Sequence, residues 1–388
     1  MKVLFVVTEL NLGGITTACI NFYNLLVEKG HSVNILNMAG AEDKEMSPFD
    51  NKVNILYLDK KRQYWNVTMS KARIKKGLFV KLKYFAIGLK KKILTKKGKW
   101  LSTIFNNYDL NDQEYDVAIA YRQCAPCYYF VLNNVKAKKK IAFVHGTVED
   151  MGDISSWDHY LYSFDKVAYV SNAVNDGFIR RYPKLDRNAT TIYNMLDSHS
   201  IIQRAQEECE VCFNKGAINI VTVSRIENSQ KGTDRIAPIC KRLKESGITN
   251  FAWYIVGDGP DFELCKKQAE ELGVTDRLFF LGAKTNPYPY LKAADFSVLP
   301  TKGESFGLVV VESLILGTPP IVCDYPALKE LLQDDFNGII VPQDGDKLYE
   351  AVKKMVKENA FFERIRNNCL SYSYDNEYVY QQFLEAVK

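Results

Sequence analysis

The sequence predicts an α/β protein with two domains, each built around a parallel, doubly wound sheet. Short apolar segments alternate with helical segments along the chain, which is the pattern of parallel sheets. This pattern runs through one series and starts again near residue 218, so we expect two such domains. The length of 388 residues suits two domains of about 190 residues each.

The first half of the chain opens with a strand, a glycine-containing loop and a helix. The strand is KVLFVVTEL, the loop is NLGG, and the helix runs through ITTACINFYNLLVEKG to Gly30. A second strand begins at His31. Further strands of this half are predicted at 53–58, 117–120, 141–144 and 167–170.

The second half repeats the pattern. Strands are predicted at 218–223, 252–256, 278–281, 296–299, 320–322 and 338–341. A polar stretch, SIIQRAQEECE, lies between the two halves, and we place the boundary between Asn194 and Asn214. The chain is therefore divided into a Rossmann-like domain over residues 1–200 and a second over residues 201–360.

Composition limits the classes of partner and location. Apolar residues make up 47% and charged residues 25% of the chain, and the net charge of +5 is too small for a nucleic-acid-binding polycation. The apolar run in MKVLFVVTEL is too short for a signal peptide. No segment approaches the roughly 20 apolar residues of a membrane span, so we expect a cytoplasmic protein.

Nine cysteines include two C-x-x-C pairs, Cys124/Cys127 and Cys209/Cys212. Together the pairs could form a four-thiolate zinc site. Their separation of about 80 residues is wider than the spacing of zinc ribbons. We therefore expect reduced, mostly buried thiols and no metal site.

Residues 71–99 form a basic insertion in the first domain. The segment holds twelve Lys and Arg residues and no Asp or Glu, and its apolar residues recur at three- and four-residue steps. A helix with this pattern carries an apolar stripe flanked by lysines. Such a helix can lie on an anionic membrane surface, so we expect peripheral association with the inner face of the cell membrane. A core-packed helix with a solvated basic face is the alternative.

Two glutamates eight positions apart lie in TKGESFGLVVVESLILGTPP. A helix that begins near residues 306–307 would leave Glu304 in the preceding loop and place Glu312 in its second turn. The first-turn amides would have no partner within the helix and could bind an anion such as phosphate. A carboxylate one turn further in suits the vicinal hydroxyls of a ribose. Two ordinary helix glutamates are the alternative.

Two cations lie in the loop after the first strand of the second half. This loop reads VSRIENSQKG and contains Arg225 and Lys231. Open α/β sheets bind ligands at the carboxyl ends of their strands, where the two cations could neutralise a diphosphate. A solvated pair of surface cations is the alternative.

Taken together, these motifs resemble retaining glycosyltransferase family 4 of the GT-B fold, as found in bacterial surface-polysaccharide synthesis. The matching features are Arg225 and Lys231 in an R-x5-K-G loop, the GDGP turn at 257–260, Gly282 and the E-x7-E motif from Glu304 to Glu312. The resemblance covers nearly the whole chain. It implies two Rossmann-like domains that face each other across a cleft, the first binding the acceptor and the second the nucleotide-sugar donor.

The resemblance also implies a role for each matching residue of the second domain. Arg225 and Lys231 would hold the donor diphosphate, and the amides of Gly307 and Leu308 would bind its phosphates. Further contacts would come from Glu312 to the ribose, from Glu304 with the backbone of Ser305 and Phe306 to the sugar, and from the backbone at Ala283 and Lys284 to the base.

Residues of the first domain complete the implied site. Gly14, in the loop after the first strand, allows the backbone to approach a phosphate or the acceptor closely. Family members commonly follow this loop with an acidic or basic pair, whereas Ile15, Thr16 and Thr17 follow here. His145 ends the predicted strand IAFV and would face the donor sugar as a catalytic residue. A merely hydrogen-bonded histidine is the alternative.

The implied activity is transfer of a hexose or N-acetylhexosamine, most often UDP-linked, to a glycan or lipid-linked acceptor, with retention and without metal or other cofactor. The family's last helix often returns to the first domain, which we expect for residues 361–388. A catalytically silent partner subunit and a nucleotide-sugar 2-epimerase are the alternative functions.

Overall fold

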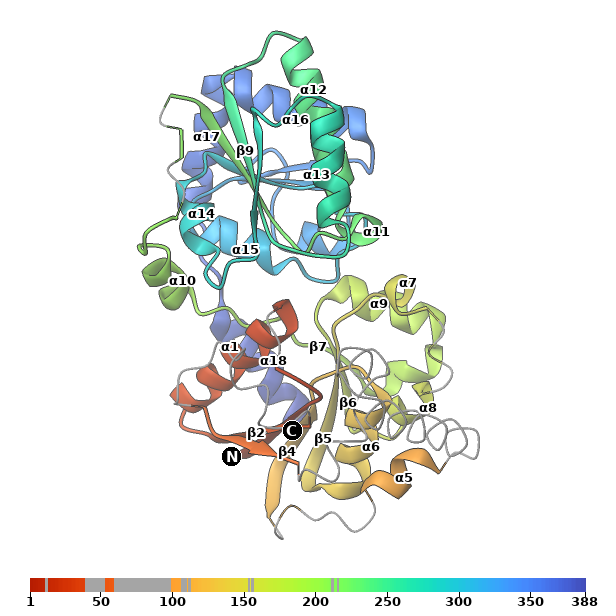
Figure 1. The fold of residues 1–388 in the computed structure, drawn as a ribbon. Coiled ribbons are helices and arrows are strands. Elements are labelled where there is room, and N and C mark those ends of the chain that lie inside the picture. The colour runs from red at the N-terminus through yellow and green to blue at the C-terminus, as the bar shows by residue number, and fades with distance from the viewer. Residues whose placement is uncertain are drawn as a thin grey trace.

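The computed structural model describes residues 1–10, 13–38, 53–58, 99–105, 110, 113–152, 154, 157–210, 213–214 and 216–388. They form two parallel sheets, each with helices on its faces (Figure 1). Apart from Lys99, the basic insertion 71–99 lies outside the described residues, so its association with a membrane stays a prediction. Within the described ranges, no helix is long and apolar enough to cross a bilayer.

The N-terminal sheet has seven strands in the order β3-β2-β1-β4-β5-β6-β7. Their bounds are β1 Lys2–Val7, β2 Ser32–Asn37, β3 Ile55–Tyr57, β4 Glu114–Ala120, β5 Lys136–Val144, β6 Lys166–Tyr169 and β7 Ala189–Thr191. Every neighbouring pair is parallel. The order reverses at β1 and β4, so the loops that follow these two strands lie side by side.

Helices cover both faces of this sheet, because each has an apolar face to bury. They are α1 Gly14–Glu28, α5 Trp100–Phe105, α6 Ala125–Asn134, α7 Val148–Met151, α8 Asp158–Leu161, α9 Asn172–Arg181 and the 3-10 helix η3 Pro183–Asn188. In α9, the Ser171 hydroxyl caps the helix by accepting from the amide of Val174.

The C-terminal sheet has six strands in the order β10-β9-β8-β11-β12-β13. The strands are β8 Ile218–Val223, β9 Phe251–Val256, β10 Leu278–Gly282, β11 Phe296–Leu299, β12 Pro320–Cys323 and β13 Ile339–Val341. Its helices are α10 Ser198–Arg204, α11 Asn228–Lys231, η4 Thr233–Arg235, α12 Ile236–Glu245, α13 Phe262–Glu271, α14 Tyr288–Ala293, α15 Leu308–Ile315, η5 Pro326–Glu330, α16 Gly345–Lys357 and α17 Asn359–Leu370. The predicted strands are all present, and the two parallel sheets confirm the predicted α/β class.

The chain crosses between the domains twice, over residues 192–197 and 371–375. The two crossings lie together, since the Tyr374 hydroxyl donates to the carbonyl of Asn194 at 2.6 Å and the Leu196 amide donates to Asn376 at 3.2 Å. They are the connections about which the domains can move relative to each other.

Residues 361–388, expected to form one returning helix, instead belong to two. Helix α17 packs on α15 and α16 of the C-terminal domain. Only α18, Asn376–Val387, lies on the N-terminal domain, beside α1 (Figure 1). There Phe383 meets Phe22 edge-on at 5.3 Å between ring centres. The chain breaks between the helices because residues 371–375 must span the gap between the domains.

Candidate functional site

Helix α15 is preceded by a glycine, Gly307, in a left-handed backbone conformation that other residues rarely adopt. Gly307 is the N-cap with φ +99°, and a side chain there would bring Cβ to 2.5 Å from Leu328 Cδ2. Gly307 has no side chain that could accept a hydrogen bond from the first turn. The amides of Leu308 and Val309 in this turn have no partner within the helix. The start of α15 therefore presents amides and a positive helix end suited to an anion.

A partly buried ion pair lies next to this helix start. Lys231 Nζ lies 2.9 Å from Glu304 Oε2, and the two side chains are only 22% and 14% exposed. Lys231 ends α11, and Gly232 follows with φ +64° against the end of β11, where a Cβ would lie 2.1 Å from the Pro300 carbonyl oxygen. The glycine is thus required for the lysine loop to reach the Glu304 loop.

Arg225, predicted to act with Lys231, has a different environment. Its side chain is 67% exposed and lies 3.3 Å from the Glu227 carboxylate. The GDGP turn packs closely against the residue before Arg225, since a Cβ on Gly257 would lie 1.8 Å from the Ser224 carbonyl oxygen. The structure therefore joins Lys231 directly to Glu304, and leaves Arg225 at the surface with Glu227 as its ion-pair partner.

Glu312 is buried between α15, α14 and α10, with only 6% exposure. Burial raises its pKa to about 7, and the hydrogen bond from Tyr288 and the charge of Arg204 only partly oppose this. The Tyr288 hydroxyl lies 3.4 Å from Glu312 Oε1, and the Arg204 guanidinium lies 5.0 Å from the Tyr288 ring centre. Sequence reasoning missed Arg204, because its polar stretch predicts a linker.

The loop predicted to meet the base follows β10. Ala283 is exposed, and Lys284 pairs with the Glu210 carboxylate. Helix α10 holds the same loop, because Arg204 Nη2 donates to the Thr285 carbonyl at 3.1 Å. The backbone of residues 283–285 is thereby held beside α10.

Three predicted residues of the C-terminal domain contact the N-terminal domain. The Ser171 hydroxyl donates to the carbonyl of Ser305 at 2.8 Å, and the ring centre of Phe306 lies 5.9 Å from that of Tyr193. A Cβ on Gly14 would lie 3.1 Å from Leu308 Cδ1. The helix start therefore lies at the boundary between the two domains.

One carboxylate of the C-terminal domain binds the N-terminal domain through three hydrogen bonds. Glu330 accepts from the amides of Asn172 and Ala173 at 3.0 and 2.8 Å, and from the Tyr193 hydroxyl at 2.7 Å. The two amides belong to the first turn of α9, where a negative charge is favoured. Sequence reasoning missed Glu330, since a single glutamate carries no local pattern.

His145 follows β5 and is only 6% exposed. Its Nε2 lies 2.8 Å from the Tyr121 carbonyl oxygen, and its amide donates to Gln123 Oε1. Burial lowers its pKa to about 3. Because a carbonyl can only accept, Nε2 carries the proton and Nδ1 is left as an acceptor. The ring is therefore neutral at physiological pH and is no source of a proton.

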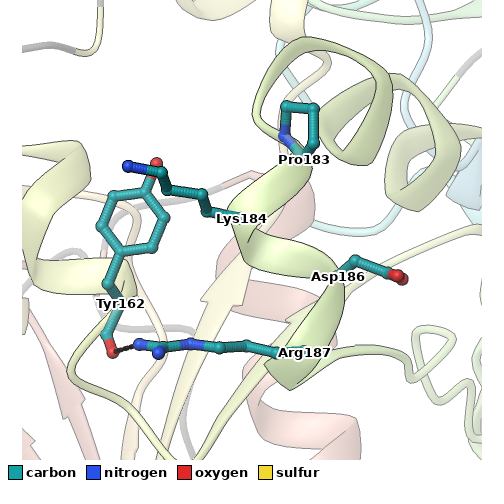
Figure 2. A pocket seen from close by; sticks show the side chains of 5 residues that line it. All are labelled: Tyr162, Pro183, Lys184, Asp186 and Arg187. Carbon is teal, nitrogen blue, oxygen red and sulfur yellow. Dashed lines mark hydrogen bonds between the residues drawn. The ribbon is translucent and has the colours of Figure 1, made fainter.

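A surface hollow elsewhere is lined by Tyr162, Pro183, Lys184, Asp186 and Arg187 (Figure 2). Arg187 Nη2 donates to the Tyr162 carbonyl at 2.7 Å. The hollow holds none of the predicted site residues, and its mixed lining lacks the apolar walls typical of a ligand pocket.

The two C-x-x-C pairs are not brought together. Cys124 and Cys127 belong to the apolar cluster between the N-terminal sheet and α6, whereas Cys209 packs against a different cluster. Cys212 lies outside the described residues. Among the residues that are described, no group of three or more His, Cys, Asp or Glu side chains could hold a metal ion.

Comparison with known proteins identifies a family for part of the chain. Residues 206–372 match the family described as "Glycosyl transferases group 1". The N-acetyl-alpha-D-glucosaminyl L-malate synthase of Bacillus anthracis is 25% identical over 223 residues, which are 56% of this chain and 58% of the relative. The alpha-monoglucosyldiacylglycerol synthase of Streptococcus pneumoniae is 32% identical over 127 residues, 32% of this chain and 28% of that protein. The match thus covers little more than half of the first relative and less than a third of the second.

Solved structures match over the whole chain. A crystal structure of S. aureus TarM in complex with Fondaparinux, alpha-GlcNAc-glycerol and UDP has a TM-score of 0.72 at 14% identity, covering 100% of this chain and 99% of TarM. Anabaena Alr3699/HepE in complex with UDP and glucose has a TM-score of 0.70 at 16% identity, with coverage of 100% and 99%. The fold is therefore the predicted two-domain GT-B fold.

Proposed function

We propose that this protein is a retaining glycosyltransferase that moves a hexose or N-acetylhexosamine from a UDP-linked donor to a glycan or lipid-linked acceptor in bacterial surface-polysaccharide synthesis. The observation that carries the proposal is the Lys231–Glu304 pair, at 2.9 Å, beside the uncapped start of α15. A cation and free amides at one place suit a diphosphate. The UDP bound by TarM and HepE in the same fold supports this donor class.

The donor site works by stabilising the charge of the leaving diphosphate. As the bond to the sugar breaks, negative charge grows on the phosphate, and Lys231 with the amides of Leu308 and Val309 offsets it. Glu304 holds the ammonium in place before the donor arrives, and then contacts the sugar. Arg225, exposed at the rim, moves from Glu227 to the diphosphate when the donor binds.

In the N-terminal domain, His145 acts as a neutral hydrogen-bond acceptor. Its protonated Nε2 is held by the Tyr121 carbonyl, so Nδ1 accepts from a hydroxyl of the donor sugar. This role positions the sugar without transferring a proton. Domain contact at Ser171 and Ser305 closes the site and excludes water, which favours transfer over hydrolysis.

The acceptor and the place of action follow from charge. The twelve Lys and Arg residues of 71–99 favour an anionic membrane surface, and with it a lipid-linked or membrane-proximal acceptor. Liposome flotation checks this proposal: binding should require anionic lipid and should be lost when the segment is deleted. Activity should persist in excess chelator, because the proposed chemistry uses no metal; loss of turnover that Mg²⁺ restores would contradict that.

The test of donor binding is calorimetry with UDP-glucose, UDP-N-acetylglucosamine, UDP-galactose and GDP-mannose. Loss of a charged hydrogen bond costs about 1.5–3 kcal/mol, so Lys231→Met should weaken the best donor about 10- to 150-fold. Because this change also leaves Glu304 unpaired, the double variant Lys231→Met/Glu304→Gln should recover part of the loss. Lys241→Met is the control, since Lys241 is exposed on α12 and, among the described residues, forms an ion pair only with Glu245.

The proposal fails if both Lys231→Met and Arg225→Ala bind the best donor as tightly as the parent. Product analysis separates the alternative functions. A silent partner subunit would release no nucleotide with any donor and acceptor, and a 2-epimerase would isomerise the donor without an acceptor. Retention is tested by the proton NMR coupling of the anomeric hydrogen in the product.

A further inference from the structure

Two cysteines lie at the start of helix α6, in the sequence Cys124-Ala125-Pro126-Cys127. Cys124 is the N-cap, with extended φ −156° and ψ 150°, and the ten-residue helix begins at Ala125 with Pro126 in its first turn. Residues three apart at a helix start lie on one face. The two side chains therefore lie on the same side of the first turn of α6.

The two thiols differ in exposure and acidity. Cys124 is partly exposed, whereas Cys127 is fully buried with Sγ 3.7 Å from the Val6 carbonyl oxygen. The hydrogen bonds from Cys127 and the charge of Arg122 lower the pKa of Cys124 against the opposing effects of burial and Glu9. Burial raises the pKa of Cys127. This is the asymmetry of an accessible attacking thiolate and a protected resolving thiol.

The other described cysteines lack these properties. Of the eight that the structure describes, Cys124 alone has a lowered pKa. Cys209 is the other partly exposed one, and burial raises its pKa. A purely structural pair would be buried on both sides and inert. The described residues also offer no third ligand that would make the pair a metal site.

We propose that Cys124 and Cys127 are a redox-active dithiol that closes reversibly to a disulfide. With hydrogen peroxide as oxidant, the Cys124 thiolate attacks one oxygen, the O–O bond breaks, and sulfenic acid and hydroxide form. The hydroxide takes up the proton that the thiol lost on ionisation and becomes water. The Cys127 sulfur then attacks the sulfenic sulfur, loses its proton and releases a second water. In total, two thiols and one hydrogen peroxide give one disulfide and two waters. A dithiol reductant reverses the change by attacking the sulfur of the partly exposed Cys124, taking the two sulfurs back to thiols as it becomes a disulfide itself.

The pair adjoins the loop that holds His145. The Tyr121 carbonyl accepts from His145 Nε2, and Gln123 Oε1 accepts from the amides of His145 and Gly146. A disulfide holds its two sulfurs at about 2.05 Å, which is closer than two thiols can approach without a bond. Its formation therefore pulls Cys124, the residue next to Gln123, toward Cys127 in α6. We therefore expect oxidation to lower sugar transfer; this part alone rests on the proposed function.

Thiol chemistry tests the dithiol without any activity assay. The full-length protein is equilibrated in buffers of reduced and oxidised glutathione, alkylated in acid and mapped by mass spectrometry. The parent and the control Cys209→Ser should form a 124–127 disulfide. Cys127→Ser should instead carry glutathione on Cys124, and Cys124→Ser should leave Cys127 unmodified. The proposal is overturned if both thiols of the parent remain alkylatable in fully oxidised glutathione, or if Cys209 reacts faster than Cys124.

A second measurement tests the coupling to the site. Peroxide followed by desalting should lower turnover of the parent at least several-fold, reduction should restore it, and Cys124→Ser should keep its turnover throughout. Equal turnover of the oxidised and reduced parent overturns the coupling. Absence of turnover with every donor in the reduced protein counts against the proposed function instead, because the glutathione titration is independent of it.

Discussion

Glu330 offers the sharpest test of how the two domains are held together. Its carboxylate accepts three hydrogen bonds from the N-terminal domain, from the amides of Asn172 and Ala173 and from Tyr193. Glu330→Gln keeps the size of the side chain but removes the charge. The substitution also places an NH2 group where one carboxylate oxygen was. Because both oxygens accept from a backbone amide, this NH2 group faces an N–H donor in either orientation. The substitution therefore converts at least one attraction into a repulsion.

The magnitude follows from these contacts. A hydrogen bond to a charged group contributes about 1.5–3 kcal/mol, and a negative charge at a helix start adds about 0.3–1 kcal/mol. Since Glu330 is partly exposed, the lower part of this range applies, and we expect a loss of about 2–3 kcal/mol of interdomain contact. The ratio of open to closed molecules should then rise about 30- to 150-fold.

Hydrogen exchange at the first turn of α9 measures this change. The amides of Asn172 and Ala173 should exchange faster in Glu330→Gln, and small-angle scattering should show a larger radius of gyration. Glu350→Gln is the matched control, because Glu350 is exposed on α16 and its one ion pair within the described ranges is with Lys353. If Glu330→Gln exchanges and scatters like the parent and the control, Glu330 does not hold the domains and the reasoning is refuted.

Three further predictions concern stability. Burial raises the pKa of Glu312 to about 7 from its ordinary value of 4.5. The contribution of Glu312 to stability is therefore complete below pH 4.5 and should fall by about 3 kcal/mol as pH rises through 7. Urea unfolding of the parent at pH 5 and 8 should show this loss, and the loss should be absent in Glu312→Gln. Gly307→Ala should lower the free energy of unfolding by about 2–5 kcal/mol, because the residue has a left-handed backbone and a close contact. Gly273→Ala is the control and should lower it by only about 1–2 kcal/mol, since Gly273 has φ +65° and open space around it. Equal unfolding temperatures of the two variants would contradict this. Phe383→Ala should destabilise the N-terminal domain by about 3–5 kcal/mol, and an unchanged calorimetric transition would show that α18 contributes no packing.

The strands were predictable because their signal is local. An apolar run of four to seven residues between polar turns is sufficient to predict a buried parallel strand. Strand β7, Ala189–Thr191, was missed because its three residues include no large apolar side chain. The break between α17 and α18 was missed as well, since the aromatic spacing continues through residues 371–375, and only the gap between the domains interrupts the helix.

The site was predictable only in part, because a local pattern predicts positions within one motif but not contacts between distant segments. Gly307 and Glu312 belong to one short motif, so their positions on α15 followed from the spacing. Lys231 and Glu304 are 73 positions apart, and their meeting depends on how β8 and β11 pair. Glu330 lies 158 positions from Asn172. Nothing in the sequence around Glu330 indicates that its side chain contacts the N-terminal domain, so sequence reasoning did not find it.

The return of α18 to the N-terminal domain affects the order in which the protein can fold during synthesis. Phe22 lies in α1, but its partner Phe383 lies in α18, which is synthesised after the strands of the C-terminal sheet. At about 5–20 residues per second, the N-terminal domain waits on the order of tens of seconds for α18. During that time the surface that α18 will cover is exposed to water, so the nascent chain is most open to chaperones and to aggregation while its second domain is being translated.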